Sequence, residues 1–240
     1  MMLAANPRLF VALDVPDAAQ ARAIVRALAG LPIGFKVGLQ LLHAEGPSLV
    51  RALREKAPLF VDAKLHDIPQ TVERAAQAIG RLGPAYVTLH ALGGRQMLAR
   101  GAAALAESAA SVGFAPPRTL AVTILTSHDE HTVRDELGLP EHPEHAAVRL
   151  ARLAVEAGAA GVVCAPHEAA AVRLALGPTP AIVTPGVRMG SVAADDQRRV
   201  ATPAAAIRAG ATAIVVGRPI TAAPDPRAAA TAVLADMDRA

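Results

Sequence analysis

Short apolar runs, most of them rich in valine and isoleucine, alternate along the chain with longer stretches whose apolar residues recur at helical spacing. Eight such runs lie at residues 9–13, 33–37, 58–63, 85–89, 119–124, 161–164, 181–184 and 213–216. The stretches between them, for example residues 18–28, 48–56, 72–82 and 146–157, are rich in Ala, Leu and Arg, and this composition favours helices. Strands that alternate with helices, without long polar linkers, predict βαβ units and a parallel sheet.

The number of units predicts how the sheet is arranged. Eight βα units predict an α/β fold of the closed (β/α)8 type, a TIM barrel, and 240 residues suit a single domain covering residues 1–240. A doubly wound open sheet is the alternative. It is disfavoured because the sequence Asp-Val-Pro-Asp at residues 14–17 follows the first run, where a dinucleotide-binding fold needs glycines.

Composition indicates the class of protein and its cellular location. Hydrophobic residues make up 52% of the chain, yet no run of about 18 uncharged apolar residues could span a membrane. Residues 1–8 lack a basic segment followed by an apolar stretch, so we expect no secretory signal. The single cysteine, Cys164, excludes an internal disulfide and fits a reducing compartment, so we expect a cytoplasmic protein. Because Cys164 lies in an apolar run, we expect a core residue rather than a nucleophile.

Charge and aromatic content argue against a nucleic-acid partner. The net charge is only +3, and the arginines are dispersed singly along the helical stretches. With no Trp, one Tyr and four Phe, the chain also lacks aromatic platforms on which single-stranded bases stack. We therefore expect neither nucleic-acid nor membrane binding.

Polar residues gather at the carboxyl ends of the predicted strands, where barrels carry their active sites. With two glycines among them, they are Asp14, Lys36, Asp62, Lys64, His90, Thr123, Thr126, Gly186, Arg188, Gly217 and Arg218. Ordinary core strands more often end in turn residues, so the pattern predicts a functional site at this end of the barrel. For His90, we expect a role in orienting a carboxylate or the strand end rather than a role as a base.

The strongest motif is a lysine bracketed by two aspartates, Asp62, Lys64 and Asp67. Asp62 and Lys64 are two residues apart at a strand end and therefore project to the same face. The same alternation directs Lys36 toward the barrel axis, because both its neighbours are apolar. Asp67 precedes Pro69, which suits a first helical turn, so Asp67 is predicted at a helix start.

An alternating array of these four charges has a structural and a functional interpretation. Each ion would offset the desolvation of its neighbours, but buried ion networks often only break even in stability. A salt-bridge plug at the barrel mouth therefore explains the array poorly, since packed hydrophobic residues would close the barrel as well. For Asp67 alone, an N-cap role worth about 1 kcal/mol is a strong alternative. Thr71 equally suits a plain first-turn helix residue.

A second cluster follows the last two predicted strands. Gly186 and Arg188 come after the seventh run, and Gly217 and Arg218 after the eighth. Barrel loops at these positions frequently bind phosphate. Glycine lets the backbone approach the anion, and arginine can contact it through two N–H groups. The alternative is a strand-ending glycine followed by a surface arginine.

A segment rich in histidine and acidic residues lies between the fifth and sixth runs. Its metal-ligating side chains are His128, Asp129, Glu130, His131, Glu141, His142, Glu144 and His145. The segment has no HExxH spacing and is broken by Gly138, Pro140 and Pro143. We therefore predict a solvated loop with a short helix, and no metal site.

The motifs taken together resemble the orotidine 5′-monophosphate decarboxylase family nearly end to end. Residues 62–71 resemble the family's DxKxxDIPxT signature, with Gln70 where the family usually has Asn. The supporting matches are Leu13-Asp14, Phe35-Lys36-Val37-Gly38, Leu125-Thr126-Ser127, Pro185-Gly186-Val187-Arg188 and Val216-Gly217-Arg218. The long signature is very specific, and the short motifs support it.

This resemblance implies a homodimeric enzyme with two active sites at the subunit interface. One subunit would supply Lys36, Asp62 and Lys64 to each site, and the other would supply Asp67 and Thr71. The resemblance also implies substrate-binding roles for further residues. Asp14 and Lys36 would hold ribose hydroxyls, Thr126 the pyrimidine edge, Gly217 and Arg218 the phosphate, and Arg188 and Gln197 would belong to a phosphate-gripping loop at residues 186–200.

The chemistry implied by the family suits the charged motif. Loss of CO₂ from C6 of the pyrimidine leaves a carbanion that the ring cannot delocalise, and the sequence shows no signature of a cofactor that could act as an electron sink. An ammonium at Lys64, kept charged by Asp62 and Asp67, could stabilise the developing charge and then protonate C6. We therefore expect a decarboxylase that needs neither metal nor cofactor.

Three other functions remain as alternatives. Magnesium-dependent sugar-phosphate decarboxylases and aldolases of the same superfamily also carry DxKxxD, but they typically place a metal-binding Glu where this chain has Lys36. A Schiff-base aldolase needs a deprotonated lysine, which two adjacent aspartates disfavour. A non-catalytic nucleotide-binding barrel would bind uridine monophosphate without turnover.

Overall fold

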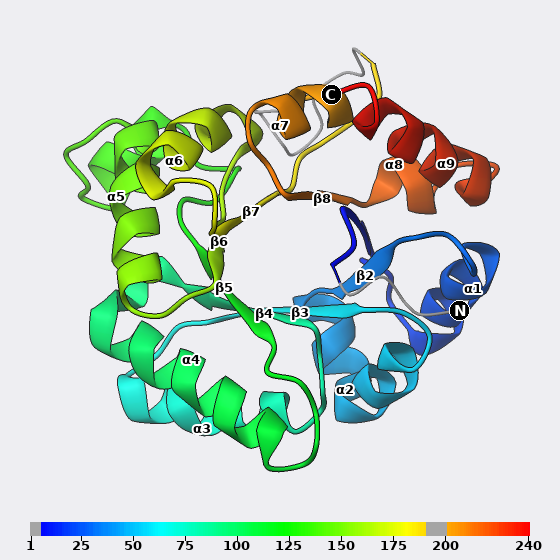
Figure 1. Cartoon of the computed structure of the whole chain (residues 1–240), viewed down its shortest axis with the longest axis horizontal. Coiled ribbons are helices and arrows are strands. Elements are labelled where there is room, and N and C mark those ends of the chain that lie inside the picture. The colour runs from blue at the N-terminus through cyan, green and yellow to red at the C-terminus, as the bar shows by residue number, and fades with distance from the viewer. Residues whose placement is uncertain (1–5, 191–200) are drawn as a thin grey trace.

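Eight parallel strands close into a barrel in the computed structural model, which describes residues 6–190 and 201–240 (Figure 1). The strands pair in chain order, and the last pairs with the first. They are β1 (Leu9–Ala12), β2 (Gly34–Val37), β3 (Leu59–Leu65), β4 (Tyr86–His90), β5 (Arg118–Val122), β6 (Gly161–Val163), β7 (Ala181–Thr184) and β8 (Ala213–Val216). Each strand falls on one of the eight apolar runs, so the predicted (β/α)8 barrel is confirmed.

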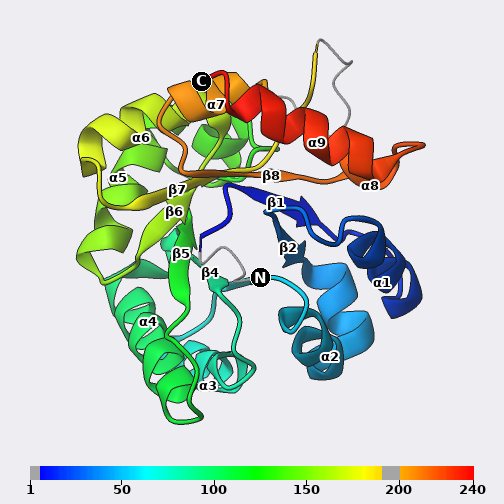
Figure 2. The same ribbon diagram turned by 45° about the vertical axis from the view of Figure 1, so that its right-hand side comes forward.

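Helices surround the barrel on its outside (Figure 1, Figure 2). They are α1 (Ala18–Ala27), α2 (Leu39–Arg54), α3 (Pro69–Gly80), α4 (Gly94–Ala110), α5 (Pro143–Glu156), α6 (Ala169–Leu176), α7 (Pro203–Arg208), α8 (Arg218–Thr221) and α9 (Pro226–Met237), with short helical turns η1 (Ala91–Gly93), η2 (Thr132–Glu136) and η3 (Pro166–Glu168). Among the residues that the structure describes, no helix is both long and apolar enough to cross a membrane.

Several elements differ by a few residues from the sequence prediction, and the differences at α2 and β3 have structural consequences. Helix α2 begins at Leu39, well before the predicted start at residue 48, because Gly46 (φ 63°) and Pro47 interrupt it and hide its periodicity. Strand β3 continues to Leu65, two residues beyond the predicted run. Lys64 therefore lies inside the strand together with Asp62.

Alternation along the strands separates two kinds of packing. Outward residues such as Val11, Val37 and Val61 are fully buried against the helices. Inward residues at the amino-terminal end of the barrel include Phe10, Phe60 and Tyr86, whose ring centroids lie 5.0–5.9 Å apart. These aromatic rings fill the barrel at one end, so a cavity can form only at the other.

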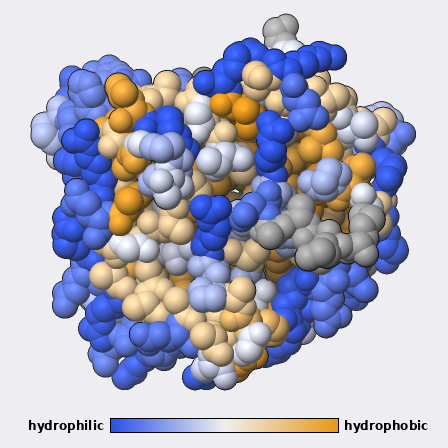
Figure 3. Space-filling view, viewed as in Figure 1, coloured by the Kyte–Doolittle hydropathy of each residue, from blue (hydrophilic) through white to orange (hydrophobic). Residues whose placement is uncertain are grey.

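The outer faces of the helices carry the polar residues. On the face shown in Figure 3, hydrophilic residues lie mainly around the periphery, and apolar residues lie mainly nearer the centre. This distribution is the one expected when amphipathic helices pack their apolar sides onto a sheet.

Candidate active site

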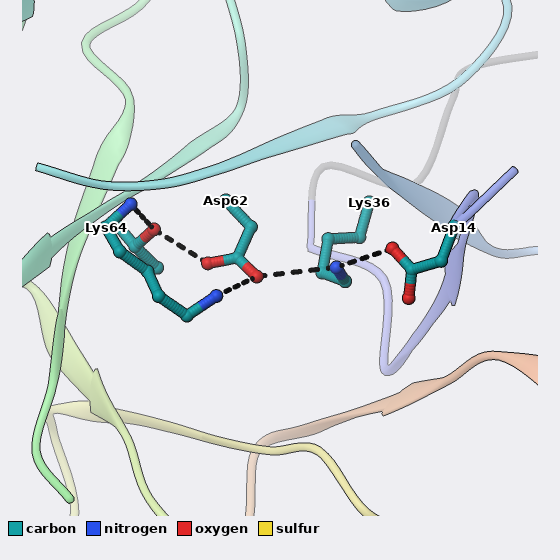
Figure 4. Close-up of polar contacts among 5 residues, drawn as sticks. Asp14, Lys36, Asp62 and Lys64 are labelled. Atoms are coloured by element: carbon teal, nitrogen blue, oxygen red, sulfur yellow. Dashed lines mark hydrogen bonds and ion pairs between the residues drawn. The ribbon is translucent and has the colours of Figure 1, made fainter. Parts of the chain in front are cut away.

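Four charged side chains form a continuous row at the carboxyl end of the barrel (Figure 4). Lys36 Nζ lies 3.2 Å from Asp14 Oδ1 and 3.4 Å from Asp62 Oδ2. Lys64 Nζ lies 2.7 Å from the same Asp62 oxygen. The side chains of Lys36 and Asp62 are each only 11% exposed, so two ammonium groups share one buried carboxylate oxygen.

The strand register explains why these side chains meet. Lys36 on β2 is directly paired with Ala12 on β1 and with Phe60 on β3. Asp62 lies two residues beyond Phe60 and therefore points into the barrel from the next layer up. Asp14 follows β1 and closes the row. The sequence predicted that Lys36, Asp62 and Lys64 come together, and the structure places them together.

Lys64 has an unusual main-chain conformation. Its φ of 46° lies in the left-handed region, which residues with a Cβ seldom adopt. The pairing of β3 with β4 also shifts register between Val61 and Leu65. Local strain of this kind is typical of functional positions, where the surrounding structure holds it in place.

Thr88 on β4 is a site residue that the sequence analysis missed. Its side chain is fully buried, and its hydroxyl donates to Asp62 Oδ1 at 2.8 Å. The hydroxyl oxygen of Thr88 in turn accepts the backbone N–H of Lys64 at 2.9 Å. A sequence signal existed, because Thr88 is a polar residue inside an apolar run, two positions after the inward-facing Tyr86.

The electrostatic surroundings keep Asp62 ionised. Burial raises the pKa of this carboxyl, but the ammonium groups of Lys36 and Lys64, together with hydrogen bonds from Lys64 and Thr88, outweigh that effect. The pKa of Asp62 consequently lies below its ordinary value. At neutral pH the row therefore alternates negative and positive charge.

The row lines a cavity of about 490 Å³, large enough for a mononucleotide. Nine of the residues predicted from the sequence line this cavity: Asp14, Lys36, Asp62, Lys64, Thr126, Gly186, Arg188, Gly217 and Arg218. Ile124, Val163 and Val215 supply apolar wall. Gln197 lies outside the described residues.

Two predicted site residues, Asp67 and Thr71, do not line the cavity of their own chain. Both are exposed at the start of α3. The predicted N-cap role of Asp67 is wrong, because Ile68 occupies the N-cap of α3 and Pro69 its first turn. The Asp67 carboxylate instead accepts the Ile68 backbone N–H at 2.6 Å.

The loops after β7 and β8 bring two arginines to the cavity. Gly186 has a φ of 76°, a conformation that favours glycine, and Arg188 follows it. Arg188 donates its backbone N–H to Ala201 at 3.0 Å, which ties this loop to the start of the next helix. Gly217 is the N-cap of α8 and precedes Arg218. The two guanidinium groups make this part of the cavity suitable for an anion.

His90 is neutral at physiological pH. Burial, followed by the positive charges that His66, Lys64 and His128 can carry, lowers its pKa from 6.5 to about 4. Its ring stacks on His66 at a centroid distance of 5.2 Å, and its Nδ1 accepts the Leu92 backbone N–H at 3.4 Å. This contact is consistent with the expected role at the strand end.

The remaining sequence candidates behave as ordinary structural residues. The histidine-rich segment contains the short helix η2, as predicted, and its last residues belong to the start of α5. His131 is paired with Asp135 at the exposed surface of η2. The described part of the chain contains no group of three or more His, Cys, Asp or Glu side chains that could hold a metal ion. Cys164 is buried, and burial raises the pKa of its thiol well above the ordinary value. The expectation of a core cysteine is therefore confirmed.

Comparison with known proteins gives one consistent result. A sequence model described as "Orotidine 5'-phosphate decarboxylase / HUMPS family" matches residues 7–233. A relative from Anaeromyxobacter sp. (strain K), named orotidine 5′-phosphate decarboxylase, is 53% identical over 97% of this chain and 99% of its own length. One of the same name from Moorella thermoacetica is 48% identical over 98% of this chain and 93% of its own length.

A solved structure shows the same similarity in three dimensions. The crystal structure of orotidine 5′-phosphate decarboxylase from Lactobacillus acidophilus superimposes with a TM-score of 0.86 at 35% identity, covering 97% of this chain and 99% of the other. The matches extend over nearly the whole chain, well beyond the charged motif. The chain belongs to the orotidine 5′-phosphate decarboxylase / HUMPS family.

Proposed function

We propose that this protein is a carboxy-lyase that converts orotidine 5′-monophosphate to uridine 5′-monophosphate and CO₂, the last step of de novo pyrimidine nucleotide synthesis. The observation that carries the proposal is the Asp62 carboxylate shared by Lys36 and Lys64 in a cavity that also holds two arginines. The names of the relatives agree with this activity.

The same row supports decarboxylation without a metal ion. Both ammonium groups lie within 3.4 Å of Asp62 Oδ2, so a divalent cation at this oxygen would meet two positive charges. A magnesium-dependent sugar-phosphate enzyme needs the opposite arrangement, with several oxygen ligands free for the metal. The charged side chains of this cavity therefore favour a pyrimidine nucleotide over the substrate of a magnesium-dependent sugar-phosphate enzyme.

The lining of the cavity suggests how the nucleotide binds. The phosphate is placed at Gly217 and Arg218, with Arg188 beside it. The ribose hydroxyls are placed at Asp14 and Lys36, which already contact each other at 3.2 Å. The pyrimidine is then directed toward Thr126, between the apolar wall and Lys64. This orientation brings C6 to the row of charges.

Lys64 acts as the proton donor in this proposal. As CO₂ leaves, negative charge develops on C6, and the Lys64 ammonium stabilises it before transferring a proton. One such ion pair at ~4 Å contributes about 4 kcal/mol at an effective dielectric near 20. Enzymatic accelerations generally need roughly 8 to 23 kcal/mol. Binding energy from the remote phosphate, used to hold the substrate against the charged row, is the natural supplement.

We propose further that the protein is a homodimer in which Asp67 and Thr71 complete the site of the partner. Both residues are exposed and are absent from the lining of their own cavity. Ile68, which follows Asp67 in the chain, is 65% exposed, and Leu92 in η1 is 38% exposed. Exposed apolar side chains next to exposed site residues suit a surface that a second copy covers.

The proposal also includes the domain organisation, the cellular location and the partners of the enzyme. Residues 1–240 are taken as one catalytic domain, which the single closed barrel supports. The buried, unpaired Cys164 supports a reducing, cytoplasmic location. The small net charge supports a protein that binds its nucleotide substrate rather than nucleic acid or a membrane.

The first experiment measures the loss of orotidine 5′-monophosphate absorbance with purified protein in excess EDTA. Turnover that Lys64→Ala abolishes supports the proposed decarboxylase and the role of Lys64. Turnover that EDTA abolishes and magnesium restores contradicts metal independence. Binding of uridine 5′-monophosphate without turnover under either condition indicates a non-catalytic barrel.

Subunit mixing tests the shared site. Lys64→Ala and Asp67→Ala proteins, each inactive alone, should regain activity when mixed, because a mixed dimer has one complete site out of two. Random reassociation makes half the dimers mixed, so recovery should approach about a quarter of the wild-type sites. Lys64→Ala mixed with Asp62→Asn is the matched control and should recover no activity. In the proposed dimer one subunit supplies both Asp62 and Lys64 to a site, so every site of a mixed dimer lacks one of them.

A further inference from the structure

Thr88 contacts two neighbouring members of the charged row, Asp62 and Lys64, and the sequence motif assigned no role to it. We infer that Thr88 is a positioning residue whose hydroxyl fixes the Asp62 carboxylate and the Lys64 main chain in a single arrangement. The inference rests on the proposed function for its catalytic consequence, whereas the arrangement itself can be tested without turnover.

The hydrogen-bond directions at Thr88 are fixed by chemistry. A backbone N–H can only donate and a carboxylate can only accept. The Lys64 N–H at 2.9 Å must therefore donate to Thr88 Oγ1, and the one hydroxyl proton must point to Asp62 Oδ1 at 2.8 Å. Thr88 itself is fully buried, so its hydroxyl has no access to solvent.

This arrangement determines the orientation of the carboxylate. Asp62 Oδ2 accepts both ammonium groups, at 2.7 Å from Lys64 and 3.4 Å from Lys36. Rotation of the carboxylate about its Cβ–Cγ bond would move Oδ2 away from one or both lysines. The hydroxyl of Thr88 opposes that rotation because it holds Oδ1 from the other side.

The same hydroxyl supports the strained main chain of Lys64. The ladder between β3 and β4 shifts register between Val61 and Leu65, and Lys64 adopts its φ of 46° inside this irregular stretch. Within it, the side chain of Thr88 accepts the Lys64 N–H. A side-chain acceptor on β4 thus positions the backbone from which the proton donor projects.

Other charges around Asp62 are compatible with this role. Asp14 after β1, Lys36 on β2 and Lys64 on β3 belong to the charged row, and Arg188 and Arg218 reach the cavity from the loops after β7 and β8. His90 on β4 is neutral at physiological pH. The hydroxyl is the neutral partner of the carboxylate, and its hydrogen bond contributes to the lowered pKa of Asp62.

Two substitutions test the role of the hydroxyl. Thr88→Val keeps the shape and β-branching but removes both hydrogen bonds, whereas Thr88→Ser keeps the hydroxyl. We expect the single-turnover decarboxylation rate to fall about 10- to 100-fold in Thr88→Val and to stay within about threefold of wild type in Thr88→Ser. The affinity for uridine 5′-monophosphate should change less than the rate does.

Thr123→Val is the matched control for loss of a buried hydroxyl. Thr123 is fully buried near the end of β5, and its hydroxyl donates to the Val163 carbonyl at 3.1 Å, away from Asp62. Its loss should lower thermal stability about as much as Thr88→Val does. It should leave the single-turnover rate near wild type.

The deciding measurement is the pKa of Asp62, followed by carboxyl ¹³C NMR in the free protein and assigned with Asp62→Asn. This pKa should be higher in Thr88→Val than in wild type, and unchanged in Thr88→Ser and Thr123→Val. An unchanged pKa in Thr88→Val overturns the inference whatever the rates are.

If Thr88→Val does not fold, Thr88→Ala is measured in its place. If wild type fails to decarboxylate its substrate, the proposed function is wrong, while the NMR titration still decides the role of Thr88.

Discussion

The two ends of the barrel interior are built from the same strands but have opposite chemistry. At the amino-terminal end, Phe60 on β3 and Tyr86 on β4 pack their rings together. Two residues later along the same strands, Asp62 and Thr88 form a hydrogen bond at the base of a cavity. One step of the strand alternation thus separates a packed apolar layer from a charged one.

The two ends of the barrel interior contribute differently to stability and to function. Burial of an aromatic side chain contributes roughly 1.5–3 kcal/mol to folding, so the amino-terminal layer stabilises the barrel. Burial of Asp62 is opposed by desolvation, which its two lysines offset, and such networks often only break even. We therefore expect substitutions at the carboxyl end to act mainly on the reaction and those at the amino end mainly on stability.

The largest of the following effects is expected for Arg218→Ala. Loss of hydrogen bonds to a charged phosphate should lower kcat/KM for orotidine 5′-monophosphate about 10- to 100-fold, although Arg218 is placed far from C6. The control is orotidine, which has no phosphate. Wild type and Arg218→Ala should process orotidine equally slowly, and an equal loss on both substrates would contradict the phosphate assignment.

Gly38→Ala tests the outer half of the charged row. A Cβ on Gly38 would lie 2.9 Å from Asp14 Oδ1 and 3.1 Å from Lys36 Nζ, so the contact between these two side chains must shift. The φ of −90° suits alanine, so folding should be preserved. We expect KM to rise roughly three- to tenfold, as for the loss of about one hydrogen bond.

A double-mutant cycle with Asp14→Ala gives the control for this effect. If Gly38→Ala acts by displacing Asp14 and Lys36, most of its cost should disappear once Asp14 has been removed. Additive effects in the double variant would show that Gly38→Ala acts elsewhere, and the outer half of the row would lose its assigned role.

A pH titration of stability probes the rim of the carboxyl end. The pKa of His90 is about 4 in the folded protein against an ordinary 6.5, so the unfolded chain binds more protons between these values. Its contribution to stability is therefore complete above pH 6.5 and is lost as the pH falls toward about 4. The melting temperature should rise less over this range in His90→Gln than in wild type, and identical slopes would exclude His90 as the cause.

The comparison between the two ends also shows what the sequence could predict. The barrel followed from eight apolar runs, and the meeting of Lys36, Asp62 and Lys64 followed from a two-residue alternation. These features depend on periodicity within a strand, which a single sequence records. The same pattern placed Asp14 at the correct end of the barrel, but its contact with Lys36 required the register between β1 and β2.

Features that depend on irregular backbone could not be predicted in this way. The contact between Thr88 and the Lys64 N–H depends on the register shift between β3 and β4, and so does the conformation of Lys64. The N-cap prediction for Asp67 failed because Pro69 at the first helical position makes Ile68 the cap. Asp67 and Thr71 have no place in the cavity of their own chain, so only a second copy can test their predicted roles.

The smallest effect is expected for Tyr86→Phe. This variant tests the difference between the two ends of the barrel most directly, because Tyr86 lies two residues before Thr88 on the same strand. The change removes only the hydrogen bond from the Tyr86 hydroxyl to Asn6 Oδ1, which measures 3.1 Å. It should cost about 0.5–1.5 kcal/mol of stability, and the melting temperature should fall by a few degrees at most. Decarboxylation should stay within about twofold of wild type, since the aromatic layer remains packed. Thermal unfolding and kcat/KM should therefore be measured side by side for Tyr86→Phe and Thr88→Val, and only Thr88→Val should lose activity. A rate loss in Tyr86→Phe comparable to that in Thr88→Val would mean that the two ends of the barrel are not independent.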